Sequence, residues 1–419
     1  MVSTSALGEM LNALLERPRQ YLKTDKTGPL ERLCDELMHE DGEIERLLIA
    51  SQILNRFEEL DPQAQASFFS HLNDVLDVDP EEISSTATAY AKSGDPQDYR
   101  QLARATEPGR YELLRRLNQP PGATTQLVRM RAALLKMKKS NPDLARTDTD
   151  FTLMLRAWFN RGFLVLRQIT WESPASILEK IIEYEAVHEI ETWDDLRRRL
   201  HPSDRRCFAF FHPAMPDEPL IFVEVALSKG IPSSIQDVLT DRREILEEET
   251  ADTAVFYSIS NCQAGLAGIS FGNSLIKQVV RDLSLELPNI KNFVTLSPIP
   301  GLRRWAAERG LEVDVTSPPV IRKLAATYLL NEKGKKNLPL DPVARFHLGN
   351  GAQVFAIHAD ADSSENGDAQ SYGAMVNYLY EPDKIADNLQ RFSTGEKLAA
   401  SNSVNTLARR GTQMLRTAD

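Results

Sequence analysis

Three motifs in the second half of the chain place reactive side chains beside structural breaks, and the first contains Ser297. This serine ends the apolar run "NFVTLS" and is followed directly by "PIPG". Proline fixes φ, removes a backbone donor and biases the preceding residue toward an extended conformation. The pattern therefore predicts a hydroxyl at the stiff end of a buried strand. Neither histidine nor aspartate adjoins Ser297 in sequence, so a nucleophilic triad is not indicated locally.

The second motif, "VARFHLGNGA", contains His347, and the third, "MVNYLYE", contains Tyr378 and Tyr380. We expect His347 on a strand. Histidine titrates near neutrality and can transfer a proton in catalysis. Tyrosine combines an apolar ring with a phenolic donor, which suits the wall of a reaction site. Each residue also has an ordinary structural interpretation: a serine bonded to its own turn, a core histidine, and a core tyrosine with a paired hydroxyl.

A glycine-rich loop lies between a predicted strand, "TAVFYSIS", and a predicted helix, "SLIKQVVRDLSLELP". Glycines allow backbone amides to approach a ligand closely, and amides beside a helix N-terminus form a pyrophosphate site. The loop matches neither the Walker A motif nor the dinucleotide fingerprint, and a glycine-rich turn without a ligand stays open as the alternative. The candidate ligand-binding residues are Gln263, Gly265, Gly268, Ile269, Ser270, Phe271, Gly272 and Asn273.

These motifs require elements that hold them in place, and the chain divides into two textures. Residues 1–168 show apolar residues at helical spacing, with breaks at Asp95-Pro96, Pro108-Gly109 and Pro120-Pro121. We expect a bundle of six to eight helices, the last of which includes "LMLRAWFNRGFLVLRQITWESP". Residues 169–419 contain short aromatic and β-branched runs that alternate with helical segments at 175–186, 193–200 and 272–287.

The predicted fold is therefore α+β and multidomain, with an all-α helical domain (1–168) followed by an α/β domain with a mixed sheet (169–419). The acidic segment 360–371 is predicted to be a surface loop. The formal net charge of −11 argues against nucleic acid as a bulk partner. The absence of a run of 18 apolar residues predicts no membrane span, and the N-terminus does not resemble a secretory signal.

The three cysteines, Cys34, Cys207 and Cys262, are far apart and form no metal-binding pattern with the histidines. An odd, sparse count fits a reducing compartment, and we therefore expect a cytoplasmic protein with reduced, partly buried thiols. No histidine spacing typical of a metal site occurs, so no metal is expected.

Five segments together resemble malonyl-CoA decarboxylases: "RRCFAFFHPAMPDEPLIFVEVAL", "VFYSISNCQAGLAGISFGNSLIKQVV", "LSPIPG", "PVARFHLGNGA" and "MVNYLY". The glycine-rich loop also resembles the pyrophosphate loop of the GNAT superfamily of acyl-CoA-binding proteins. The resemblance implies a helical oligomerisation domain and a GNAT-like catalytic domain. It also implies that Ser297 and His347 are catalytic and that Tyr380 lines the site. Ser270 stands where animal members have a glutamate, so an acid at this position is not supported here.

The implied reaction converts malonyl-CoA to acetyl-CoA and CO₂ without a metal or organic cofactor, as part of malonate and fatty acid metabolism. Loss of CO₂ leaves an enolate, which needs hydrogen-bond donors and an acid to protonate its carbon. We expect a homodimer or homotetramer formed through the helical domain. Two alternatives stay open: a CoA-dependent acyltransferase of the same fold, and a non-enzymatic CoA-sensing or scaffolding protein. The basic segment "NEKGKKN" (331–337) is either a solvated turn or a cation patch for the 3′-phosphate of CoA.

Overall fold

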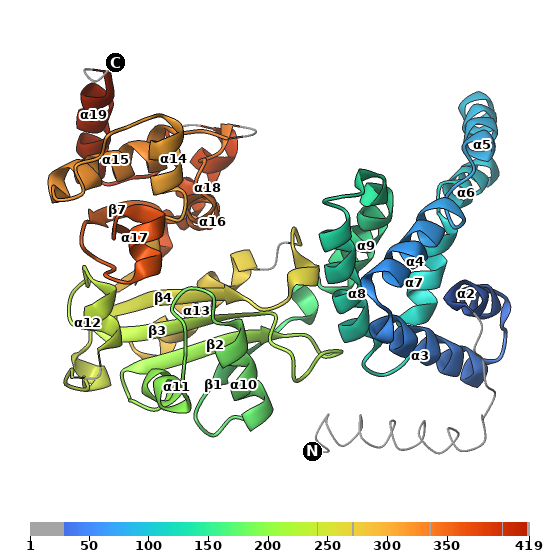
Figure 1. Ribbon diagram of the computed structural model, residues 1–419, viewed down its shortest axis with the longest axis horizontal. Helices are drawn as coiled ribbons and strands as arrows, with labels where there is room; N and C mark the ends of the chain where they lie inside the picture. Colours follow the sequence, from blue (N-terminus) through green and yellow to red (C-terminus); the bar gives the residue numbers. More distant parts are fainter. Residues whose placement is uncertain (1–28, 241, 270–271, 335–336, 396, 417–419) are drawn as a thin grey trace. The chain divides into compact units, whose positions relative to one another are not determined.

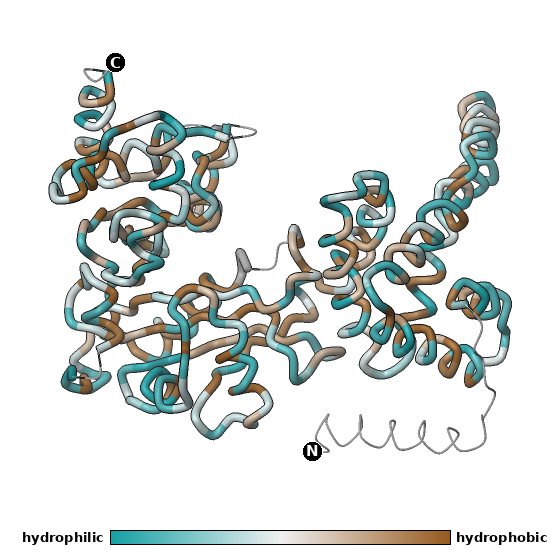
Figure 2. The backbone as a smooth tube through the Cα atoms, viewed as in Figure 1, coloured by the Kyte–Doolittle hydropathy of each residue, from teal (hydrophilic) through white to brown (hydrophobic). Residues whose placement is uncertain are grey.

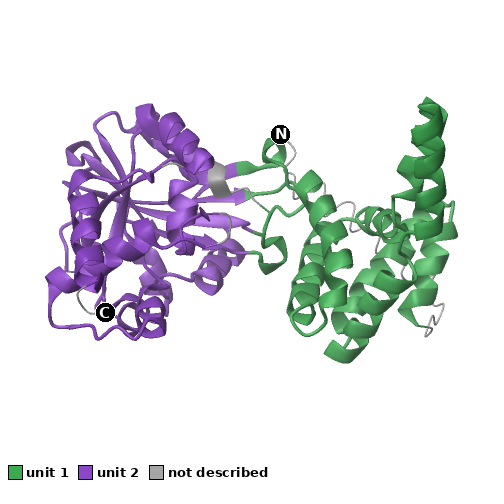
Figure 3. Cartoon of the chain, turned by 90° about the horizontal axis from the view of Figure 1, so that it is seen from above, with its two compact units in different colours: residues 1–165, 211–218, 263–270 green, residues 166–210, 219–262, 271–419 purple. Residues whose placement is uncertain are grey.

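The computed structural model describes residues 29–240, 242–269, 272–334, 337–395 and 397–416, and it divides into two compact units (Figures 1 and 3). Unit 1 contains the chain up to Val165 together with residues 211–218 and 263–270. Unit 2 contains residues 166–210, 219–262 and the chain after 270. The glycine-rich loop therefore belongs to the helical unit, although it follows the fourth strand of the α/β unit in sequence.

Unit 1 is built from helices that begin at well-defined caps. Asp61, Asp79 and Asp95 each accept a hydrogen bond from a backbone N–H two or three residues ahead, and proline occupies the first helical position after each. The predicted helical character of this region is confirmed. Its helices are α2 (Leu30–His39), α3 (Glu43–Glu59), α4 (Pro62–Asp74), α5 (Pro80–Ser93), α6 (Pro96–Ala105), α7 (Gly109–Leu117), α8 (Ala123–Met137) and α9 (Ala145–Trp158).

The core of unit 1 contains a cluster of aromatic rings. Phe57 of α3 packs against Phe68 and Phe69 of α4, with ring centroids 5.3 and 5.4 Å apart, and all three side chains are buried. Burial of large apolar side chains provides most of the favourable free energy of folding, and tilted aromatic pairs add to it. None of the residues of α5 is buried, so this helix is held mainly by its contact with α6.

Unit 2 is organised around a mixed sheet with the strand order β1-β2-β3-β4-β5-β8-β6, and β7 also pairs with β8. Only β4 and β5 are paired in parallel among the registers described; the other pairs are antiparallel. Figure 2 shows that the central strands are largely hydrophobic. The strands are β1 (Val165–Ile169), β2 (Arg205–Phe211), β3 (Ile221–Ser228), β4 (Thr253–Asn261), β5 (Asn292–Thr295), β6 (Ser297–Pro298), β7 (Gln353–His358) and β8 (Met375–Tyr380).

Helices accompany this sheet in unit 2, and the three segments predicted to be helical are confirmed by α10, α11 and α13 (Figure 1). The predicted fold class, a helical bundle followed by a mixed α/β domain, is confirmed. The helices are α10 (Ala175–Tyr184), α11 (Trp193–Leu200), α12 (Ile235–Leu239), α13 (Gly272–Glu286), α14 (Leu302–Glu308), α15 (Pro318–Asn331), α16 (Pro342–Leu348), α17 (Glu365–Ser371), α18 (Ile385–Thr394) and α19 (Asn402–Arg416).

Three local predictions are wrong. His347 lies on helix α16 and not on a strand, because Asp341 accepts a hydrogen bond from the backbone N–H of Ala344 and Pro342 occupies the first helical position. The predicted last helix of the bundle stops at Trp158, and the β-branched and apolar residues after it form β1. The acidic segment 360–371 is not only a loop, since helix α17 covers most of it.

In the part of the chain that the structure describes, none of the helices is long and apolar enough to cross a bilayer.

Candidate active site

The candidate serine lies where a parallel strand pair comes apart. β4 and β5 are paired as far as Phe256, whose carbonyl oxygen accepts a hydrogen bond from the N–H of Leu296 at 3.0 Å. β4 then continues to Asn261, whereas the segment with Ser297 leaves β4 and stays paired with β8, which already pairs with β5. Ligands of α/β proteins commonly bind at the carboxyl ends of parallel strands, where strands diverge. The end of the β4–β5 pairing therefore places Ser297 at a candidate reaction site.

Ser297, His347 and Tyr380 form one hydrogen-bonded chain. The Nε2 atom of His347 lies 3.2 Å from the Oγ atom of Ser297, and its Nδ1 atom lies 2.8 Å from the hydroxyl oxygen of Tyr380. The three side chains come from β6, α16 and β8, and their relative exposures are only 6%, 2% and 1%. The structure thus brings together all three residues that the sequence motifs single out as catalytic candidates.

The directions of these hydrogen bonds follow from the protons that each group carries. The hydroxyl of Ser297 donates its one proton to the Oγ1 atom of Thr295 at 2.8 Å, so toward Nε2 of His347 it can act only as an acceptor. Nε2 of the neutral imidazole therefore carries the proton, and Nδ1 accepts from the hydroxyl of Tyr380. Burial raises the pKa of Tyr380, which keeps this phenol protonated. In a nucleophilic triad the histidine accepts the proton of the serine. Here the imidazole donates to Ser297, so the direction favours His347 as a donor and not as the base of a triad.

The imidazole of His347 is neutral in this site. Burial lowers its pKa to about 3, and its ring stacks on Tyr378 with centroids 4.5 Å apart and an interplanar angle of 22°. A neutral imidazole is the form that carries one donor and one acceptor, as the chain of hydrogen bonds requires. A carboxylate placed beside the ring would raise its pKa again, since an opposite charge favours the protonated form.

Two further residues, Thr295 and Asp341, position the site and were missed by sequence reasoning. Thr295 accepts hydrogen bonds from Ser297 and, at 3.1 Å, from the backbone N–H of Tyr378. Asp341 is fully buried at the start of the helix that carries His347, and burial raises the pKa of this carboxyl to about 6. The Asp-Pro pair at 341–342 is a helix-start signal, so its role as a cap was available from the sequence.

Tyr328 explains the glycine that ends the serine motif. A Cβ atom added to Gly301 would lie 2.0 Å from the hydroxyl oxygen of Tyr328, which no real side chain tolerates. Tyr328 belongs to α15, is buried, and packs against the ring of Trp305 of α14 at a centroid distance of 5.4 Å. Gly301 therefore allows α15 to pack closely on the turn that follows Ser297.

The glycine-rich loop packs within unit 1. A Cβ atom on Gly265 would lie 1.8 Å from the backbone oxygen of Val128 in α8, so this glycine is needed for packing. Arg131, also in α8, donates to the carbonyl oxygens of Gly265 and Ala267 at 2.6 and 3.0 Å. Gly268 differs, because its φ is +79° and the space around its Cβ position is open. Of the two glycines, Gly268 is the better candidate for backbone approach by a ligand.

The remaining loop candidates have mixed outcomes. Gln263 is hydrogen-bonded to Glu218 at 3.5 Å, and Ile269 is buried. Ser270 and Phe271 lie outside the described residues. Helix α13 begins at Gly272, and for Gly272 and Asn273 only the backbone is described. The loop 263–270 belongs to unit 1, whereas Ser297, His347 and Tyr380 belong to unit 2.

Over the described ranges, no group of three His, Cys, Asp or Glu side chains is arranged to hold a metal ion. Cys34, Cys207 and Cys262 are all buried free thiols, as predicted.

The fold and the site define the class of this protein. It is a two-domain protein with a helical domain followed by a mixed-sheet domain, and the sheet domain holds a buried, hydrogen-bonded Ser, His and Tyr. The model of the malonyl-CoA decarboxylase C-terminal domain matches residues 162–318 and 312–418, and that of the N-terminal domain matches residues 76–159. The chain belongs to the malonyl-CoA decarboxylase family.

Individual relatives agree with this assignment. The mitochondrial malonyl-CoA decarboxylase of Rattus norvegicus is 30% identical over 458 residues, which cover 97% of this chain and 91% of the rat protein. The protein of the same name from Anser anser anser is 39% identical over 299 residues, or 60% of this chain and 59% of the goose protein. The crystal structure of malonyl-CoA decarboxylase from Rhodopseudomonas palustris is 44% identical with a TM-score of 0.85, covering 90% of this chain and 98% of that one. That from Agrobacterium vitis is 45% identical, also with a TM-score of 0.85, covering 91% and 99%.

Proposed function

We propose that this chain decarboxylates malonyl-CoA to acetyl-CoA and CO₂. Family membership supports the reaction, and the observation that carries the proposal is the buried Tyr380–His347–Ser297 chain, in which each donor points toward the serine. Decarboxylation of a malonyl thioester needs donors near the developing enolate oxygen and an acid near its carbon. It needs no nucleophile, and this agrees with a serine whose own proton is donated to Thr295.

The proposed step breaks the bond between the carboxylate carbon and the α-carbon of the malonyl group. The electron pair moves onto the α-carbon and the thioester carbonyl to form the enolate, and CO₂ leaves. When malonyl-CoA binds, the hydroxyl of Ser297 turns from Thr295 to donate to the carboxylate or the thioester oxygen. The substrate carboxylate raises the pKa of His347, so the imidazole takes up a proton from solvent before CO₂ leaves. The imidazolium then gives this proton to the enolate carbon, which forms acetyl-CoA and returns His347 to its neutral form.

The hydroxyl of Tyr380, 2.8 Å from Nδ1, fixes the orientation and tautomer of His347 throughout. We propose that the reaction uses neither a metal nor an organic cofactor, because the thioester itself accepts the electron pair and no redox change occurs. Coenzyme A is then part of the substrate. We also propose that the pyrophosphate of CoA contacts the glycine-rich loop at Gly268, on the basis of its open surroundings and positive φ.

The experiment for the activity uses purified protein and malonyl-CoA alone, with acetyl-CoA and CO₂ as the measured products. Turnover without an added acceptor supports the decarboxylase, whereas a strict requirement for an amine or other acceptor favours an acyltransferase. Ser297→Ala and His347→Ala should each lower kcat by about 10²- to 10⁴-fold. Folded variants that keep near wild-type rates would show that the site is assigned wrongly.

The loop contact has a test of its own. Gly268→Val should weaken CoA binding by about tenfold or more, since a branched side chain blocks the approach of the ligand to the backbone. Circular dichroism and thermal unfolding check that the variant is folded. Unchanged CoA affinity in a folded variant contradicts the contact.

We further propose that residues 1–168 form a homodimer or homotetramer interface. Support comes from exposed hydrophobic side chains in this region, including Ile44 at 60%, Val75 at 63% and Tyr99 at 56% relative exposure. Light scattering coupled to gel filtration measures the mass, and a monomer at micromolar concentration contradicts this proposal. We also propose a cytoplasmic location and a role in malonate and fatty acid metabolism, which cell fractionation and growth on malonate test.

A further inference from the structure

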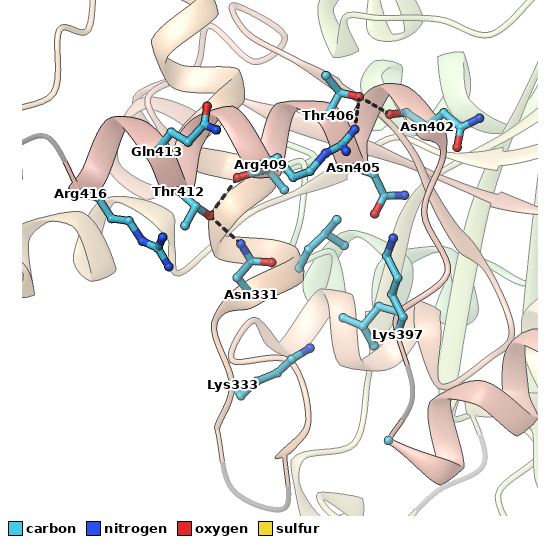
Figure 4. Close-up of a pocket in the computed structure, with 14 residues that line it drawn as sticks. Asn331, Lys333, Lys397, Asn402, Asn405, Thr406, Arg409, Thr412, Gln413 and Arg416 are labelled. Atoms are coloured by element: carbon cyan, nitrogen blue, oxygen red, sulfur yellow. Dashed lines mark hydrogen bonds between the residues drawn. The ribbon is translucent and has the colours of Figure 1, made fainter.

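A cavity of about 840 Å³ lies in unit 2 beside α15 and α19 (Figure 4). The residues that α19 contributes recur at helical spacing, so one face of this helix forms a wall of the cavity. Four cationic side chains line it, and no carboxylate does among the lining residues that the structure describes. These cations are Lys333, Lys397, Arg409 and Arg416.

The charges in this cavity lack internal compensation. Across the described ranges no salt bridge is formed by any of the four cations. Arg409 donates a hydrogen bond to the Oγ1 atom of Thr406 at 3.2 Å. All four cations are exposed to solvent, and they give the cavity a positive lining in a chain with a formal net charge of −11. This lining would attract an anion.

A second cavity shows the contrasting case. This space of about 370 Å³ is lined by several arginines, but carboxylates of the same chain neutralise them. Arg199 is paired with Glu224 at 3.0 Å, and Arg243 is paired with Asp204. A cationic lining alone therefore does not require a ligand. The two cavities differ in that the described lining of the first contains no carboxylate.

Polar groups in the first cavity also suit an oxyanion. Asn331 at the end of α15 donates to the hydroxyl of Thr412 at 2.9 Å, and Asn402, Asn405 and Gln413 add amide side chains to the wall. Guanidinium and ammonium groups bind phosphate oxygens through charge-assisted hydrogen bonds, and arginine matches them with a planar fork.

We propose that this cavity binds a small, multiply charged anion of the phosphate-ester class. Such an anion has two possible sources. One is the nucleotide end of a CoA thioester, and this version rests on the proposed function. The other is a free phosphorylated metabolite that binds independently of the substrate. Both carry at least two negative charges on oxygen atoms.

Isothermal titration of the full chain with inorganic pyrophosphate and with adenosine 3′,5′-bisphosphate tests the site directly. We expect saturable binding of at least one probe at fixed, low ionic strength, because salt screens exposed charges. Arg409→Gln should weaken that binding by roughly tenfold, the loss expected for one charge-assisted hydrogen bond. Arg410→Gln is the matched control: Arg410 is the next residue of α19, is exposed, and does not line the cavity.

Enzyme assays then separate the two sources. If CoA occupies the cavity, Arg409→Gln raises the KM for malonyl-CoA with little change in kcat, and pyrophosphate competes with the substrate. If a free anion occupies it, the KM is unchanged and pyrophosphate does not compete. Both outcomes support the anion site. Absence of saturable binding, or equal affinities in wild type and both variants, overturns it. Binding is measured without turnover, so an inactive protein that still binds the probe refutes the proposed function alone.

Discussion

The buried imidazole of His347 should make folding stability fall as the pH is lowered from 7.5 to 5. Its pKa is about 3 in the folded chain because of burial, whereas an unfolded histidine titrates at about 6.5. Below pH 6.5 the unfolded chain therefore binds a proton at this histidine, whereas the folded chain does not bind it until about pH 3. Linkage then destabilises the folded state by about 2 kcal/mol at pH 5, and by almost nothing at pH 7.5.

The variant His347→Gln removes this titrating group, and the comparison uses its free energy of unfolding relative to wild type. Urea denaturation followed by tryptophan fluorescence is suitable, since Trp171, Trp193 and Trp305 belong to unit 2 and only Trp158 to unit 1. The variant lacks the hydrogen bonds of His347 at every pH, so this loss lowers its free energy of unfolding by the same amount throughout. Between pH 7.5 and 5 its stability relative to wild type should rise by about 2 kcal/mol.

The control is His201→Gln, which removes an exposed imidazole that meets water in folded and unfolded chains alike. Its stability relative to wild type should stay constant over the same range. A difference between His347→Gln and wild type that changes by less than about 0.5 kcal/mol would refute the reasoning, because the linkage relation then excludes a strongly lowered pKa.

Three other outcomes are expected from the site. Tyr380→Phe removes the donor to His347 and should lower kcat by roughly 10- to 100-fold. Tyr378→Phe removes a buried hydroxyl without a partner among the described residues and should keep kcat within about threefold of wild type. Equal kcat values for the two variants in steady-state kinetics would contradict the role of the Tyr380 hydrogen bond. Gly301→Ala should destabilise the protein by about 1–3 kcal/mol or more, and Tyr328→Phe in the same chain should recover part of this loss in a double-mutant cycle; strict additivity would show that the predicted clash does not occur. The pH profile of kcat/KM reports the ionisation of the free enzyme. Because the pKa of His347 is low, kcat/KM should not fall around pH 6.5 as the pH is lowered. A fall with its midpoint near pH 6.5 would mean that His347 has an ordinary pKa before substrate binds.

Several features of the fold were predictable from local patterns. Apolar residues at helical spacing between Asp-Pro and Pro-Gly breaks predicted the helical region, because a helix buries one stripe and each cap satisfies its first backbone donors. Short β-branched and aromatic runs predicted strands in residues 169–419, among them β4 and β5. The alternation in "VARFHLG" predicts a strand at His347, whereas Asp341 and Pro342 before it start a helix. In a seven-residue helix, the cap is the stronger signal.

The glycines show the limit of sequence reasoning most clearly. Gly265 and Gly268 look alike in a glycine-rich loop, yet one is required by the backbone of α8 and the other has a positive φ in open space. Gly301 was part of a recognised motif, but the hydroxyl that excludes a side chain there belongs to Tyr328, from another helix. Which neighbour approaches a glycine depends on packing between distant segments, and no local pattern encodes it.

The sequence by itself determined the two-part organisation, the family and the identities of Ser297, His347 and Tyr380, because periodicity and motifs are local properties. Only the tertiary structure decided how these residues act together. His347 is 50 residues from Ser297 and 33 from Tyr380, and their hydrogen bonds exist because β8 pairs with both β5 and β6 while Asp341 starts the helix that carries His347. The low pKa of His347 has the same origin, since burial is a property of the assembled core and not of any segment.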